Sequence, residues 1–221
     1  MFDETIGARS RLGRTRTGRT SLGQQVKVSA GWLIGIVGLL WGIELVNLLS
    51  GNALLQFGIL PRHLIGLRGI IFAPLLHGSL GHLIANTVPF LVLGALVLAH
   101  GRDQFLKVTV FVALAGGGLL WVVGRPSIHV GASGLIFGYF GFLLAAAWFE
   151  RHLLPVVLAL AAAVLYGGVL FGLLPLTPGV SWEGHACGFA AGIIAAKLAA
   201  PTRRPGQWTD SLTGERTSDT I

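Results

Sequence analysis

The chain of 221 residues is too apolar and too poor in charge for an ordinary soluble domain. Hydrophobic residues make up 53% of it and charged residues 11%, whereas a soluble domain carries about 25% charged residues. This balance predicts a polytopic membrane protein of the all-α class with one domain. The formal net charge is +7, but the basic residues flank hydrophobic segments instead of mixing with exposed aromatics, so we expect no nucleic-acid partner. The single cysteine, Cys187, excludes a disulfide framework and a multi-cysteine metal site.

Polar ends enclose a hydrophobic middle and divide the chain into three regions. Residues 1–28 carry basic residues among Gly, Ser and Thr and almost no large apolar residues, so we expect a disordered basic tail. Residues 29–200 are expected to form the membrane domain, and residues 201–221 a second polar tail. The first hydrophobic run carries Glu44 and Asn47 and lacks a small-residue cleavage site, which favours a retained helix over a signal peptide. Both polar residues lie on one helix face, where we expect hydrogen bonds to neighbouring segments.

Six segments approach the roughly 20 apolar residues that a helix needs to span a bilayer. They are residues 32–49, 80–98, 105–123, 133–148, 153–174 and 184–200. Apolar stretches at 54–60 and 69–76 predict that the long connection 50–79 is a structured element at the membrane interface. Of the 16 Lys and Arg residues, 13 fall on the side of the two termini. The positive-inside rule therefore predicts cytoplasmic termini and an outer-facing long connection.

In this topology the second, fourth and sixth segments begin at the outer face, and each begins with polar side chains. The second carries His77, His82 and Asn86, the fourth Ser133 and the sixth His185. Polar side chains at membrane depth are costly and mark a functional site by default. A helix start also favours developing negative charge, because its free N–H groups point outward there.

Glycines spaced by four residues predict that the fourth and sixth helices pack backbone to backbone. They are Gly134 and Gly138 on the fourth helix and Gly184, Gly188 and Gly192 on the sixth. This approach brings Ser133 and His185 within hydrogen-bond reach, the arrangement of nucleophile and base in acyl transfer. Taken alone, the glycines could be simple packing positions with Ser133 as an N-cap.

Three motifs together resemble the signatures of the rhomboid family of intramembrane serine proteases, in order and in spacing. They are Gly131-x-Ser133-Gly134, His77-x4-His82-x3-Asn86 and His185-x2-Gly188-x3-Gly192. The resemblance implies a six-helix rhomboid-like bundle in which Ser133 is the nucleophile and His185 the general base. It also implies that the oxyanion is stabilised by the side chains of His77 and Asn86 and by the backbone N–H of Ser133. The position of His82 is structural in the family.

Two departures from the family pattern alter what the resemblance implies. Phe137 stands where the best-studied bacterial rhomboids have a tyrosine, and we expect its ring to stack on His185. The long connection lacks the family's Trp-Arg pair, although Arg62 and Arg68 are present. The implied substrates are single-span membrane proteins cleaved near the outer face, with no cofactor. The resemblance predicts neither the identity of the substrate, nor the oligomeric state, nor the regulation.

Two further residues compete for the catalytic roles. His129, four residues before Ser133, is a rival base, although its place in a polar connection favours a role in ordering the loop. Glu183 is near enough to His185 in sequence to be a triad acid, but its place at a loop edge predicts a solvated carboxylate.

Three other functions compete with proteolysis. His77, His82 and His185 could hold zinc, but the chain has no H-E-x-x-H motif, and we expect no metal. A non-catalytic relative that binds membrane proteins would keep the fold and lose the dyad, whereas Ser133 and His185 are both present. A transporter would show paired repeats, which the sequence lacks.

Overall fold

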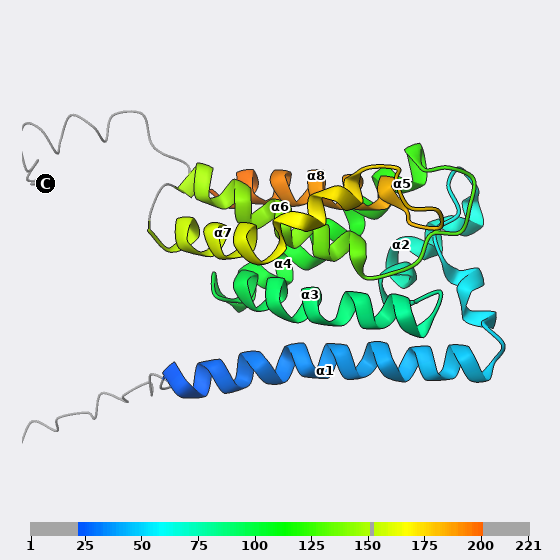
Figure 1. The fold of residues 1–221 in the computed structure, drawn as a ribbon, viewed down its shortest axis with the longest axis horizontal. Coiled ribbons are helices and arrows are strands. Elements are labelled where there is room, and N and C mark those ends of the chain that lie inside the picture. Colours follow the sequence, from blue (N-terminus) through cyan, green and yellow to red (C-terminus); the bar gives the residue numbers. More distant parts are fainter. Residues whose placement is uncertain (1–21, 151–152, 201–221) are drawn as a thin grey trace, which may run out of the picture.

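The computed structural model describes residues 22–150 and 153–200, and all regular secondary structure in these ranges is helical (Figure 1). The α-helices described are α1 Leu22–Leu49, α2 Gly69–Phe72, α3 Leu80–Leu98, α4 Arg102–Phe111, α5 Gly117–Val123, α6 Ser133–Glu150, α7 Leu153–Tyr166 and α8 Trp182–Ala199. The predicted all-α class is confirmed. Of the two predicted tails, only residues 22–28 are described, and they already belong to α1.

Five spans among the described residues are long and apolar enough to cross a bilayer, and they agree with five of the six predicted segments. They are Ala30–Leu49, Leu80–Leu98, Arg102–Val123, Ser133–Glu150 and Leu153–Leu173. The sixth helix, α8, has 18 residues but carries Glu183, His185 and Lys197. Its buried face is made mostly of Ala and Gly that pack against protein instead of lipid, which explains its weaker apolar character. The protein is therefore a multi-pass membrane bundle.

Helix α1 lies at one edge of the bundle beside α3 (Figure 1). Its buried residues Leu33, Leu40, Glu44 and Asn47 recur at helical spacing and form one stripe. Between Ala30 and Leu49 most of the other residues are exposed, and nearly all of them are apolar, as a lipid-facing surface must be. The stripe thus places two polar side chains inside the protein near the long connection.

Helices α6 and α8 form the centre of the bundle and approach each other backbone to backbone. Ten residues of α6 are buried. A Cβ at Gly188 would overlap the carbonyl oxygen of Gly134, and one at Gly192 would overlap that of Gly138. The close packing predicted from the glycine spacing is confirmed. It fixes the height of the start of α8 against the start of α6.

The third span is not a continuous α-helix. A π-helical turn, Val112–Gly116, separates α4 from α5. The Val112 side chain occupies the space that a Cβ at Gly138 would need, and a Cβ at Gly116 would stand 3.3 Å from Gly188 Cα. The π-turn therefore lies against both central helices. Such turns occur often near functional sites.

The long connection is a compact folded element, as predicted. It contains the 3-10 helices Ala53–Phe57, Leu64–Arg68 and Ala73–Leu75 as well as α2. The Arg62 guanidinium donates to the carbonyl oxygens of Val122 (3.1 Å) and Gly124 (2.7 Å) at the end of α5. Ile59 forms an isolated antiparallel bridge with His129. These bonds anchor the connection next to the start of α6, while its place at the membrane interface stays a prediction.

Candidate active site

Ser133 is the first residue of α6, so its hydroxyl lies at the N-terminal end of a long helix. Gly131, two residues earlier, has φ 123°, a conformation that L side chains rarely adopt. A Cβ at Gly131 would stand 2.8 Å from His82 Nε2 and 3.6 Å from Ser133 Oγ. The glycine therefore permits the turn into α6 and also leaves open the space between the His82 imidazole and the Ser133 hydroxyl.

His185 lies in the first turn of α8, whose N-cap Ser181 accepts the backbone N–H of Gly184 (3.2 Å). The imidazole stacks on Phe137 with ring centroids 4.1 Å apart and ring planes 9° apart, which confirms the expected stacking. Its Nδ1 lies 2.8 Å from the carbonyl oxygen of Gly172. A carbonyl only accepts, so Nδ1 carries the proton in the neutral ring and Nε2 keeps a lone pair.

The structure brings Ser133 and His185 to the same end of two packed helices. Phe137, which stacks on His185, follows Ser133 by four residues and lies on the same face of α6. A Cβ at Gly134 would stand 3.7 Å from the Gly184 carbonyl oxygen, so the sequence neighbours of both residues are in contact. Within the described chain the Ser133 hydroxyl forms no hydrogen bond to His185. Catalytic hydrogen bonds in free enzymes are often long and shorten when substrate binds.

His77, His82 and Asn86 gather opposite the start of α6. His77 is fully buried, packs edge-to-face on His82 with ring centroids 5.2 Å apart, and accepts the N–H of Ala132 at Nε2 (3.4 Å). Burial, reinforced by the neighbouring His82, lowers the pKa of His77 to about 4, so the ring is neutral near pH 7. Asn86 Nδ2 donates to the His82 carbonyl oxygen (3.0 Å). The imidazole of His82 is the partly exposed one of the two.

Asn47 on α1 joins three segments behind this cluster. Its Nδ2 lies 3.3 Å from each of Glu44 Oε2, Asn52 Oδ1 and the His77 carbonyl oxygen, and its Oδ1 accepts the Leu54 N–H (3.2 Å). The expected hydrogen bonds to neighbouring segments are confirmed for Asn47, whose partners lie in the long connection. The amide fixes the backbone of His77 relative to α1.

His129 closes the other side of the site and bonds to α8 instead of to Ser133. Its Nδ1 lies 2.6 Å from Ser181 Oγ, and its Nε2 lies 3.0 Å from the Arg125 carbonyl oxygen. This contact confirms the predicted role of His129 in ordering the loop. The prediction of a solvated Glu183 is wrong: the residue is 8% exposed, and its Oε1 lies 3.6 Å from Arg125 Nε. The ion pair forms because the loop before α6 folds over the start of α8.

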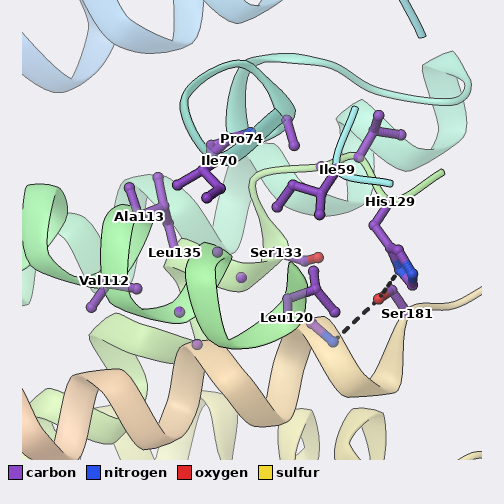
Figure 2. A pocket seen from close by; sticks show the side chains of 18 residues that line it. Ile59, Ile70, Pro74, Val112, Ala113, Leu120, His129, Ser133, Leu135 and Ser181 are labelled. Carbon is purple, nitrogen blue, oxygen red and sulfur yellow. Dashed lines mark hydrogen bonds between the residues drawn. The ribbon is translucent and has the colours of Figure 1, made fainter. Parts of the chain in front are cut away.

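A pocket opens beside Ser133, between the long connection, the third span, α6 and α8. Its wall is mainly apolar, with Ile59, Pro74 and Leu120 among the lining residues. Figure 2 shows the Ser133 hydroxyl directed toward the side of the pocket where His129 and Ser181 meet. Pockets that bind small molecules or side chains are usually lined by apolar groups with a few placed polar ones, and the pocket beside Ser133 has this composition.

The described side chains around Ser133 do not form a metal-binding site. Among residues 22–150 and 153–200, no group of three or more His, Cys, Asp or Glu side chains is placed to hold a metal ion. Cys187 is a free, buried thiol of the core.

Two contacts of the site were not predicted. The N-cap role of Ser181 has a sequence signal, because Ser is a preferred N-cap and directly precedes the helix. The contact between the Gly172 carbonyl and His185 has no sequence signal, because every residue carries a backbone carbonyl.

Comparison with known proteins decides the family. The model of the Rhomboid domain matches residues 65–202, a range that begins in the long connection and includes α3 to α8. The chain belongs to the rhomboid family. An uncharacterized protein of Mycobacterium bovis is 41% identical over 201 residues, which cover 86% of this rhomboid chain and 84% of that protein. YdcA of Bacillus subtilis, named as a candidate rhomboid protease, is 30% identical over 137 residues, which cover 56% of this chain and 63% of YdcA.

Proposed function

We propose that this rhomboid protein is an intramembrane serine endopeptidase that hydrolyses peptide bonds of membrane-protein substrates, with Ser133 as nucleophile and His185 as general base. The observation that carries the proposal is the orientation of His185. Its ring lies flat on Phe137, on the same face of α6 as Ser133, and its Nε2 is free to accept a proton. That is the arrangement by which a neutral imidazole activates a hydroxyl.

The reaction follows the acyl-transfer scheme. The Ser133 O–H proton passes to His185 Nε2 as Oγ bonds to the substrate carbonyl carbon, whose oxygen becomes an oxyanion. When the tetrahedral intermediate collapses, the C–N bond breaks and the imidazolium returns the proton to the leaving amine. A water molecule, deprotonated by the same nitrogen, then hydrolyses the Ser133 ester and restores the hydroxyl. No cofactor is needed for these steps.

The geometry favours an exchange of the two histidine roles implied by the resemblance. His77 is fully buried and its Nε2 already accepts the Ala132 N–H. His82 is partly exposed, and its Nε2 borders the open space next to Ser133 Oγ. We therefore assign oxyanion stabilisation to His82, Asn86 and the Ser133 N–H, and assign to His77 the support of the backbone before α6. Each such donor contributes about 2.7 to 4 kcal/mol to transition-state stabilisation in comparable enzymes.

The distribution of charge supports a topology with both termini in the cytoplasm and the site open toward the outer face. The substrates are then membrane proteins, single-span ones in the simplest case, whose helix must unwind near the outer interface before its backbone can reach Ser133. The apolar pocket beside the hydroxyl suits a small or apolar side chain next to the cleaved bond.

Covalent labelling tests this assignment without knowledge of the substrate. Purified wild-type protein in detergent is treated with a serine-reactive fluorophosphonate, beside Ser133→Ala and His185→Ala. We expect labelling of the wild type alone, with the adduct mapped to Ser133 by mass spectrometry. A folded wild-type protein that takes no label would overturn the proposal and favour a non-catalytic membrane-protein-binding role.

A further inference from the structure

The imidazole of His185 is held by two contacts at right angles to each other. The Phe137 ring lies 4.1 Å away on its face, with planes 9° apart, and limits tilting of the imidazole. The Gly172 carbonyl oxygen lies 2.8 Å from Nδ1 and limits rotation within the plane of the ring. Together they leave one orientation and one neutral tautomer, with the lone pair on Nε2.

Gly172 lies 13 residues before His185, on a different helical segment. It lies in the 3-10 helix Gly167–Leu173, which continues α7. The neighbouring Phe171 is 70% exposed and no residue of this 3-10 helix is buried, so the segment lies at the surface of the bundle. The position of the base therefore depends on α7 as well as on its own helix.

Only glycine fits at position 172. A Cβ there would stand 2.7 Å from Phe137 Cζ and 3.2 Å from His185 Nδ1. The Phe137 ring is buried and stacked, so it cannot move aside without losing its contact with the imidazole. The small residue is thus required by the same two rings that the carbonyl helps to hold. By contrast, a Cβ at Gly168, in the same 3-10 helix, would meet nothing within 4 Å.

We propose that the backbone carbonyl of Gly172 is the orienting member of the catalytic unit and takes the place that a carboxylate takes in a Ser-His-Asp triad. This role rests on the proposed protease function. Among the described side chains, Glu183 is the carboxylate nearest to His185 in sequence, and it pairs with Arg125. The carbonyl holds the Nδ1 proton without a buried charge, which would be costly at membrane depth. Gly172 is accordingly a positioning residue and not a catalytic one.

The tautomer of His185 is the first readout. Wild-type protein labelled with ¹⁵N-histidine is studied by NMR, and the His185 signals are assigned by their loss in His185→Gln. We expect Nδ1 to be protonated and Nε2 to be unprotonated near neutral pH. An Nε2–H tautomer in a protein that takes up the fluorophosphonate would overturn the role of Gly172 and leave the protease function intact.

The matched pair Gly172→Ala and Gly168→Ala is the second readout. A displacement of about 1 Å in a catalytic group can cost on the order of 100-fold in rate. We expect Gly172→Ala to lower kcat and the labelling rate by roughly tenfold or more relative to Gly168→Ala, with little change in KM. Its melting temperature should also lie below that of Gly168→Ala, because only the methyl group at position 172 is overpacked against Phe137. Equal kcat in the two variants would overturn the proposal. If Gly172→Ala does not fold, the tautomer of His185 in the wild type decides whether Gly172 has the proposed role. A wild-type protein that neither takes the label nor cleaves a substrate would reject the protease function itself.

Discussion

Replacing Gly188 with alanine adds one methyl group at the closest point between α6 and α8. The new Cβ would overlap the Gly134 carbonyl oxygen and would stand 2.9 Å from the Gly134 carbonyl carbon and 3.1 Å from its Cα. These are backbone atoms of a buried helix, so no side-chain rotation relieves the overlap, and the two helices must separate. The substitution therefore acts on the packing that sets Ser133 against His185.

The size of the effect follows from the nature of the clash. Overpacking a buried contact costs about 1 to 3 kcal/mol and sometimes more, and a rigid backbone partner places Gly188→Ala at the upper end of that range. For a chain of this length, each kcal/mol shifts Tm by about 2 to 4 °C. We expect Tm to fall by about 6 °C or more, and fluorophosphonate labelling of Ser133 to fall with it because α8 carries His185.

The assay is thermal unfolding of purified protein in one detergent, with Gly118→Ala as the control. Gly118 lies in α5, and a Cβ there would meet nothing within 4 Å. Alanine there gains about 0.5 to 1 kcal/mol of helix preference without a clash, so its Tm should equal or exceed that of the wild type. A Tm of Gly188→Ala within 1 or 2 °C of wild type, as judged by the scale above, would refute the account of the α6–α8 contact.

Two further predictions concern the polar groups around Ser133. Asn86→Ala should lower kcat by about 10²- to 10³-fold with a small change in KM, because an oxyanion donor acts only in the transition state; a change confined to KM would contradict that role. The second concerns His77, whose folded-state pKa of about 4 lies below the ordinary 6.5. The unfolded chain therefore binds a proton first as pH falls, and the free energy of unfolding should decrease between pH 6.5 and pH 4, by at most about 1.4 kcal/mol per pH unit from this group. Denaturant titrations of wild type and His77→Asn should give a flatter pH dependence in the variant, and identical slopes would count against a neutral buried His77.

The spans were predictable because length and hydropathy decide which segments cross a bilayer. The second span, residues 80–98, has the same bounds in the sequence analysis and in the structure. The π-turn Val112–Gly116 was not predicted, since its residues are as apolar as those of any spanning helix and the irregularity arises from packing on Gly138 and Gly188. The early start of α1 at Leu22 was missed because polar residues mask its first turns.

The approach of Ser133 and His185 was predictable in outline because glycine spacing determines how closely two helices can pack. The different surroundings of His77 and His82 were not predictable, because both are histidines of one motif. Only the structure shows that His77 is buried and accepts the Ala132 N–H, whereas His82 is partly exposed and lies next to Ser133. The ion pair between the buried Glu183 and the exposed Arg125 depends on the path of the loop before α6, which sequence patterns do not specify.

The most direct test of the central claim is cleavage of a single-span reporter protein reconstituted with the enzyme in liposomes, followed by mass spectrometry of the products. The account predicts one cut near the outer end of the reporter helix by the wild type, and none by Ser133→Ala or His185→Ala at unchanged Tm. Substantial cleavage by purified Ser133→Ala would contradict it, because no other hydroxyl in the site lies on the face of α6 that meets His185.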